Sequence, residues 1–180
     1  MSHSRATALL LLTLSAPAAA QQKSSPPPPS PVAPNPPARF RGLVGTEVAT
    51  VERILAERDE EAFDRELEEL MRSRDRRAVL ILTHLMVALP WIPELEPVGL
   101  NDGRMRKLRI EGILDKWVAS SQHEDLSGQY FRCVAYPGEE DLCPGTAEQA
   151  GGALIDWTVD ILDKLRWDPE LGRFEAPKGG

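Results

Sequence analysis

Apolar residues fill every side of the stretch 78–89, AVLILTHLMVAL, whereas elsewhere in the chain they form single stripes. A helix that is apolar all round is normally buried in a core, and these 12 residues are too few to span a bilayer, which needs about 20. We therefore predict a central buried helix. Asp75 stands where it would cap the helix start, and Pro90 ends the helix, with a turn around Trp91 and Pro93.

Two helices are predicted before the central one. The first has Thr46 as its candidate N-cap and apolar residues at helical spacing: Val48, Val51, Ile54 and Leu55. The second follows Asp59, and its sequence EEAFDRELEELM combines one apolar stripe with an acidic remainder, as is typical of a surface helix. The short connection RSRDRR predicts that this second helix lies antiparallel to the central one.

Two more helices are predicted after residue 100. One spans roughly 103–120, with Asn101 or Asp102 as its cap and an apolar stripe of Ile110, Ile113, Leu114, Trp117 and Val118. The polar segment SSQHEDLSG that follows predicts a connector. The next segment, QYFRCVAY, predicts a short strand or an extended turn, because aromatic and β-branched residues are enriched in strands.

The last predicted helix begins at Thr146, which forms a capping-box pattern with Gln149. Its inward stripe consists of Leu154, Thr158, Ile161, Leu162 and Leu165. Trp157 falls outside that stripe, so we expect this helix to be covered on more than one side. The sequence WDP at 167–169 should end it, leaving a loose tail except where Phe174 packs.

The fold class predicted for residues 39–180 is therefore all-α, or mainly so: a small bundle of about five helices with one disulfide-closed loop or short hairpin. Residues 1–20 have a positive charge, an apolar run and an Ala-Ala-Ala end, which together predict a secretory signal peptide. Residues 21–38 are proline-rich and predict a disordered, semi-rigid linker. This linker would serve as a stalk, as a ligand for a proline-binding module, or as a passive spacer.

The two cysteines, Cys133 and Cys143, should form a disulfide, because an exported chain meets an oxidising compartment. A redox-active or metal-binding pair is the alternative, but their spacing is not CxxC. The loop that they close would display Tyr136 and the acidic run Glu139, Glu140 and Asp141. These four residues form the candidate binding epitope, although such a turn is also an ordinary solvated surface.

The sequence provides no assigned catalytic residue, metal ligand or cofactor motif: GxSxG, HExxH, Walker and dinucleotide patterns are all missing. His84, within the central apolar stretch, is expected to be a neutral core histidine rather than an acid or base. His123 precedes Glu124 and Asp125, but no second histidine or cysteine at suitable spacing supports a metal site.

The charge of the chain bears on its partners. Arginines gather near residues 72–77 and 104–109 and would bind phosphate or an acidic partner, but the formal net charge is -7 and the pI is about 5.1. We therefore expect no nucleic-acid binding. Once the signal peptide is cleaved, we also expect no transmembrane segment.

The segment CPGTAEQ, followed by VDILDKLRWDPE, is similar to the C-terminal part of the periplasmic immunity proteins that protect bacteria from secreted cell-wall amidases. The resemblance covers about 28 of the 180 residues, and the upstream cysteine pattern of that family is missing. It implies a small exported protein that binds and blocks another protein.

Three functional hypotheses follow from the sequence. The first is an exported, periplasmic or secreted, helical protein-binding module that is inhibitor- or immunity-like. The second is a hydrolase of unrecognised type that uses carboxylates in a groove. The third is a structural envelope component on a proline-rich stalk. An enzyme needs convergent polar groups in a concavity, whereas a binder needs an exposed patch or a protruding loop.

We predict that the exported protein begins at Gln21, since cleavage there follows the Ala-x-Ala end of the apolar run. N-terminal sequencing of the exported material tests this. A retained Met1 would contradict both export through this segment and the oxidising compartment on which the disulfide depends.

Overall fold

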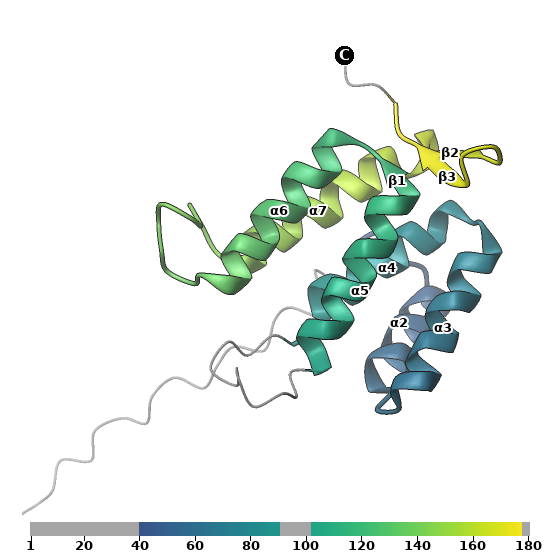
Figure 1. Cartoon of the computed structure of the whole chain (residues 1–180), viewed down its shortest axis with the longest axis horizontal. Helices are drawn as coiled ribbons and strands as arrows, with labels where there is room; N and C mark the ends of the chain where they lie inside the picture. The colour runs from purple at the N-terminus through teal and green to yellow at the C-terminus, as the bar shows by residue number, and fades with distance from the viewer. Residues whose placement is uncertain (1–39, 91–101, 178–180) are drawn as a thin grey trace, which may run out of the picture. The chain divides into compact units, whose positions relative to one another are not determined.

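The computed structural model describes residues 40–90 and 102–177 of the chain, which are mainly helical (Figure 1). The predicted signal peptide, the proline-rich linker and the positions of Trp91, Pro93 and Asn101 lie outside the described residues. The described elements are α2 (Gly45–Ala56), α3 (Glu60–Ser73), α4 (Arg76–Ala88), α5 (Asp102–Trp117), β1 (Val118–Ala119), α6 (Ser121–Ala135), α7 (Ala147–Ile161), the 3-10 helix η2 (Leu162–Lys164), β2 (Arg166–Asp168) and β3 (Arg173–Glu175).

Helix α4 is the predicted central helix, and it packs against α2, α3, α5 and α7. Nine consecutive residues, from Ala78 to Met86, are buried, so every face of the helix is covered. The Asp75 side chain caps the start by accepting the Arg77 N–H at 2.9 Å. No helix within residues 40–90 and 102–177 is long and apolar enough to cross a membrane.

The C-terminal end of α4 lies inside the protein, where its last carbonyl groups need donors from other elements. Lys107 of α5 supplies them: its side chain is 1% exposed, and its Nζ donates to the carbonyl oxygens of Met86 at 2.5 Å and Val87 at 3.2 Å. Lys107 Nζ also donates to the hydroxyl oxygen of Tyr130 in α6, and that hydroxyl donates to the Val87 oxygen at 3.1 Å. Helices α5 and α6 are thus joined to the same end of α4.

Helix α7 packs closely against this end of α4 at Gly151. A Cβ atom at Gly151 would lie 2.8 Å from Val87 Cγ1 and 3.3 Å from the Tyr130 ring, closer than packed carbon atoms come. The pair Gly151-Gly152 is unfavourable for a helix, yet α7 includes both, because the capping box of Thr146 and Gln149 fixes the helix start. Gly151 therefore serves close packing.

Helix α6 corrects the sequence-based prediction of a polar connector followed by a short strand. Ser120 is its N-cap, and one continuous helix runs from Ser121 to Ala135. Its buried residues are His123, Ser127, Tyr130 and Cys133. These follow helical spacing, but the first two are polar, so a search for apolar periodicity misses the inward stripe.

Two other predicted boundaries were wrong. The N-cap of α2 is Val44 rather than Thr46, because the Glu47 carboxylate accepts the Val44 N–H at 2.8 Å.

The tail after α7 is an ordered hairpin rather than a loose end. Strand β3 lies between β2, with which it is antiparallel, and β1, with which it is parallel, and Phe174 is 2% exposed. Trp157 is also buried, as its place outside the apolar stripe predicted.

Leu82, fully buried in the middle of α4, is the test of this core. Leu82→Ala should lower the free energy of unfolding by about 2–5 kcal/mol, through lost burial and an unfilled cavity. Met105→Ala, at a side chain that is 59% exposed, is the matched control and should change it by less than about 1 kcal/mol. Urea denaturation measures the free energy of unfolding of both variants. If Leu82→Ala lowered it by as little as Met105→Ala does, α4 would not be the central helix.

A second prediction concerns pH. Burial lowers the pKa of Lys107 from 10.5 to about 7, so the unfolded chain binds more protons than the folded one above about pH 7. The free energy of unfolding should therefore rise between about pH 7 and 9. Burial also raises the pKa of Tyr130, which opposes this trend only near pH 10 and above. Lys107→Met should flatten this rise of the unfolding free energy with pH, as measured by urea denaturation. An unchanged pH dependence would contradict the assignment of the rise to Lys107.

Candidate functional site

The segment 136–146, here called the acidic loop, connects α6 to α7 and is closed by the predicted disulfide between Cys133 and Cys143. The Cα atoms of the two cysteines lie 4.7 Å apart, and both residues belong to the hydrophobic core. Figure 1 shows the loop projecting beyond the ends of the paired helices α6 and α7. The disulfide thus fixes the far side of the loop to the last turn of α6.

The backbone of the acidic loop is ordered by its own hydrogen bonds. The carbonyl oxygen of Glu139 accepts the N–H groups of Leu142 at 3.0 Å and Cys143 at 2.7 Å. The N–H of Glu139 donates to the Tyr136 oxygen at 3.3 Å, across Gly138, whose φ of 84° is a conformation that glycine adopts readily. The disulfide and these bonds together hold the loop in one shape.

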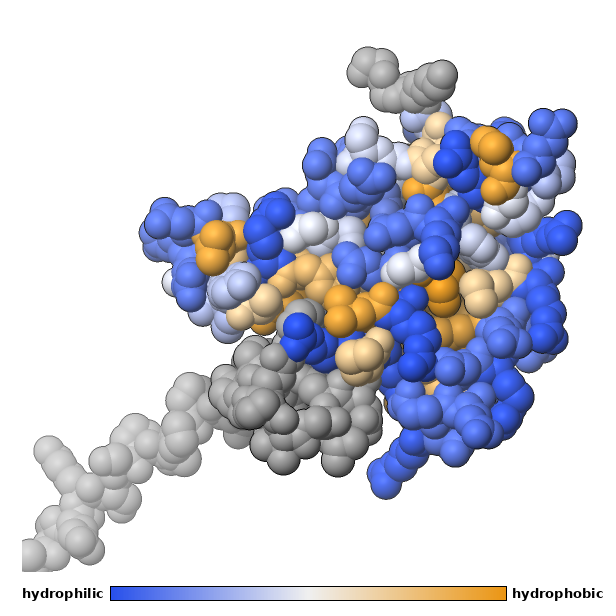
Figure 2. All heavy atoms as spheres, in the orientation of Figure 1, coloured by the Kyte–Doolittle hydropathy of each residue, from blue (hydrophilic) through white to orange (hydrophobic). Residues whose placement is uncertain are grey.

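The side chains of the acidic loop face solvent. Tyr136 and Leu142 are 47% and 38% exposed. Glu139, Glu140 and Asp141 are exposed as well, and none has an ion pair or side-chain hydrogen bond to another described residue. Glu140 and Asp141 also line an open hollow of about 600 Å³ beside Cys143. In Figure 2 polar residues dominate this projecting end. The loop therefore combines unpaired negative charge with an aromatic and an aliphatic side chain.

His84 is buried in α4, and its Nε2 lies 2.9 Å from the carbonyl oxygen of Arg41. Its ring also packs near that of Phe40, with centroids 6.4 Å apart. This arrangement agrees with a core histidine that holds the chain before α2 against the central helix.

His123 lies in a polar cluster that the sequence analysis missed. This cluster, the acid–histidine cluster, consists of Glu111 and Asp115 on α5 with His123 and Ser127 on α6. The Ser127 hydroxyl donates to Glu111 at 3.2 Å, and Nδ1 of His123 lies 3.6 Å from Asp115 Oδ1. Neither ring nitrogen makes a hydrogen bond to the described residues. Both pairs have i, i+4 spacing, but the cluster is visible only once α6 is known to be a helix.

Burial is the main influence on the pKa values of the acid–histidine cluster. Burial raises the pKa of Glu111, with a further contribution from the negative charge of Asp115, and burial also raises the pKa of Asp115. Burial lowers the pKa of His123, against the opposing influence of Glu124. These groups have acid–base character, but His123 is only 1% exposed, and its ring packs on Trp157. A substrate would not reach it in this conformation.

Most arginines of the two predicted basic groups are used within the fold. Arg76 pairs with Asp163 at 2.9 Å, and Arg106 pairs with Glu60 at 2.6 Å. Arg77, Arg109 and Arg72 pair with Glu47, Asp64 and Glu68, respectively. Arg74, by contrast, makes no ion pair to any described residue and instead lies over the Trp167 ring.

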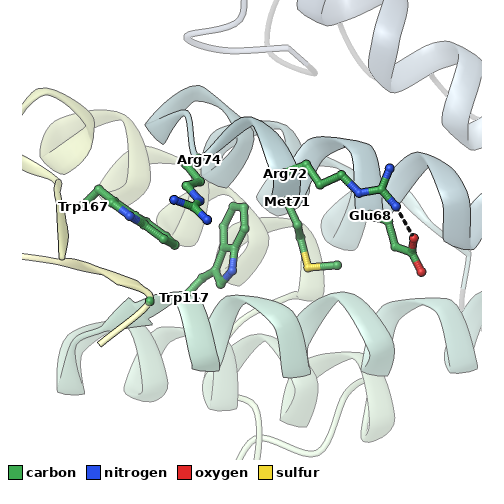
Figure 3. A pocket seen from close by; sticks show the side chains of 7 residues that line it. Glu68, Met71, Arg72, Arg74, Trp117 and Trp167 are labelled. Atoms are coloured by element: carbon green, nitrogen blue, oxygen red, sulfur yellow. Dashed lines mark hydrogen bonds and ion pairs between the residues drawn. The ribbon is translucent and has the colours of Figure 1, made fainter. Parts of the chain in front are cut away.

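Arg74 lies in a second hollow, here called the Trp–Arg pocket and defined by Met71, Arg74, Trp117 and Trp167 (Figure 3). Its volume is about 490 Å³, and Glu68 and Arg72 complete one side. The rings of Trp117 and Trp167 meet edge to face with centroids 6.0 Å apart, and the Arg74 guanidinium lies 5.5 Å from the Trp167 ring centroid. The sequence placed these residues at helix ends and in a core stripe, so it did not predict their convergence.

No group of three or more His, Cys, Asp or Glu side chains in the described part of the chain is arranged to hold a metal ion. Comparison with known proteins finds no matching family model, no matching curated protein and no matching solved structure.

Proposed function

We propose that this protein is an exported protein-binding module that acts through the acidic loop, in the manner of an inhibitor or immunity protein. The observation that carries the proposal is the set of three carboxylates, Glu139, Glu140 and Asp141, left unpaired on a loop held by a disulfide. The partner would present a basic surface with an apolar site for Tyr136 and Leu142.

Physical chemistry supports this use of the loop in two ways. A loop that is already ordered loses little conformational entropy when it binds. Unpaired negative charges on a projecting segment attract a basic partner and accelerate association. Elsewhere in the fold, carboxylates such as Glu47, Glu60 and Asp163 are engaged by arginines, whereas the three carboxylates of the loop make no ion pair to a described residue.

The proposal that the protein is exported rests on the disulfide as well as on the predicted signal peptide. Disulfides persist in oxidising compartments such as the periplasm and the cell exterior, and the predicted signal peptide would deliver the chain there. The alternative of an envelope component on a stalk depends on residues 21–38, which lie outside the described part.

The alternative of a carboxylate-using hydrolase draws support from one observation, the raised pKa values of Glu111 and Asp115 beside His123. A hydrolase would need substrate access to this cluster. The burial of His123 makes the acidic loop the better candidate.

The proposal is tested by reversing Glu139, Glu140 and Asp141 to lysine. The mature protein and this variant are used as baits against native envelope extract, and the affinity of any captured partner is then measured at low and physiological salt. We expect partner affinity to fall at least about tenfold, with little change in stability, because exposed charges contribute little to folding. The matched control reverses Glu52, Glu69 and Asp160, which are exposed and give the same change in net charge.

The double variant Cys133→Ser, Cys143→Ser should lower the free energy of unfolding by about 3 kcal/mol and also weaken partner binding, because the loop loses its anchor. If loop reversal and the control reversal leave affinity equally unchanged at low salt, where charges are least screened, the loop is only a structural staple.

A further inference from the structure

We infer that the Trp–Arg pocket is a second binding site, which takes a peptide segment whose free carboxylate binds Arg74 while an adjacent apolar side chain packs on the tryptophans. This site is separate from the acidic loop. Helix α6 begins just after β1 and ends at the loop, and α7 returns from the loop to the hairpin of β2 and β3. The hairpin and the loop thus lie at opposite ends of this helix pair (Figure 1), and the hairpin contributes Trp167 and Gly172 to the pocket.

The backbone conformation of Arg74 is the first observation. Arg74 follows the last residue of α3 with φ 51°, the left-handed conformation that glycine or asparagine usually occupies at a helix end. Arg74 is the only non-glycine residue with positive φ among residues 40–90 and 102–177. Strained backbone is characteristic of binding sites, where the side chain has a use that glycine lacks.

The second observation is an unsatisfied donor in the same place. The indole Nε1 of Trp167 is buried and has no hydrogen-bond acceptor among the described residues. Buried donors are normally paired, so two local energetic costs, at Arg74 and at Trp167, coincide at one pocket. The hairpin tip, whose Gly172 lines the pocket, also carries Leu171, which is 58% exposed.

Charge determines the class of ligand. Arg72 is neutralised by Glu68 at 2.9 Å, which leaves Arg74 as the net positive charge of the pocket. The Arg74 guanidinium lies over the Trp167 ring, and a guanidinium offers a planar set of N–H donors that suits a carboxylate. Tryptophan, arginine and methionine are also the residues that are enriched at the centres of protein interfaces. A carboxylate next to an apolar side chain matches both features.

The test uses acetyl-Gly-Gly-Leu-Leu with a free C-terminal carboxylate, compared with the same peptide as its C-terminal amide. Binding is followed by the indole N–H signals of the ¹⁵N-labelled protein, with the Trp167 signal assigned through Trp167→Phe. We expect the acid to shift the Trp117 and Trp167 signals in a saturable manner and the amide to bind about tenfold more weakly, as loss of a charge-assisted hydrogen bond implies.

Arg74→Gln should weaken binding of the acid by about tenfold, whereas Arg65→Gln, at another exposed arginine of α3, should not change it. Arg74→Gly separates binding from folding. Glycine relieves the left-handed strain, so the melting temperature should not fall, yet peptide binding should weaken by about tenfold, as in Arg74→Gln. A lower melting temperature with unchanged binding would mean that Arg74 only supports the hairpin.

Two further results would overturn the inference. Equal shifts by the acid and the amide, or none at millimolar peptide, would remove the role of the carboxylate. Saturation by inorganic phosphate at the same concentration as the acid peptide would make the pocket a simple anion site. Each outcome is independent of the acidic loop, whose charge reversal should leave peptide binding at this pocket unchanged.

Discussion

The burial of the C-terminal end of α4 is the constraint on which the rest of the structure depends. A helix covered on all sides has no solvent to satisfy its last carbonyl groups, and an unpaired buried carbonyl is costly. The Lys107 amine and the Tyr130 hydroxyl therefore bind the Met86 and Val87 oxygens from α5 and α6. Gly151 brings α7 against the same turn, so three helices are positioned by these hydrogen bonds and one missing side chain.

This arrangement explains why the two candidate sites lie where they do. Helices α6 and α7 are both fixed at Tyr130 and Gly151, and each continues from there toward the segments that carry the sites. At one end the pair carries the acidic loop, and the disulfide adds a second attachment at Cys133. At the other end it leads into the aromatic hairpin around Phe174. A rigid helix pair thus gives each site a fixed base without placing either in the core.

The sequence predicted the helices whose inward residues are apolar, and it missed α6, which buries polar residues, and the hairpin, whose strands are short. The stretch 78–89 and the capping box at Thr146 follow directly from composition and spacing, and the disulfide followed from compartment and cysteine count. Helix α6 was missed because His123 and Ser127 occupy buried positions that the hydrophobic pattern assigns to apolar residues. The hairpin was missed because strands of three residues are too short to show a period, and its pairing with β1 is set by tertiary contact.

The candidate sites were also hard to predict, because their chemistry depends on which charges the fold leaves unpaired. The sequence shows many acids and arginines but not their pairings, so Arg74 looked like its neighbours Arg72 and Arg76. In the structure those neighbours are neutralised by Glu68 and Asp163, while Arg74 lies over the Trp167 ring and has no carboxylate partner in the described ranges. The acidic loop shows the converse, with three carboxylates that make no ion pair to a described residue. Since a paired surface charge has little attraction left for a ligand, the two proposed binding sites are both places where the fold leaves charge unpaired, one negative and one positive.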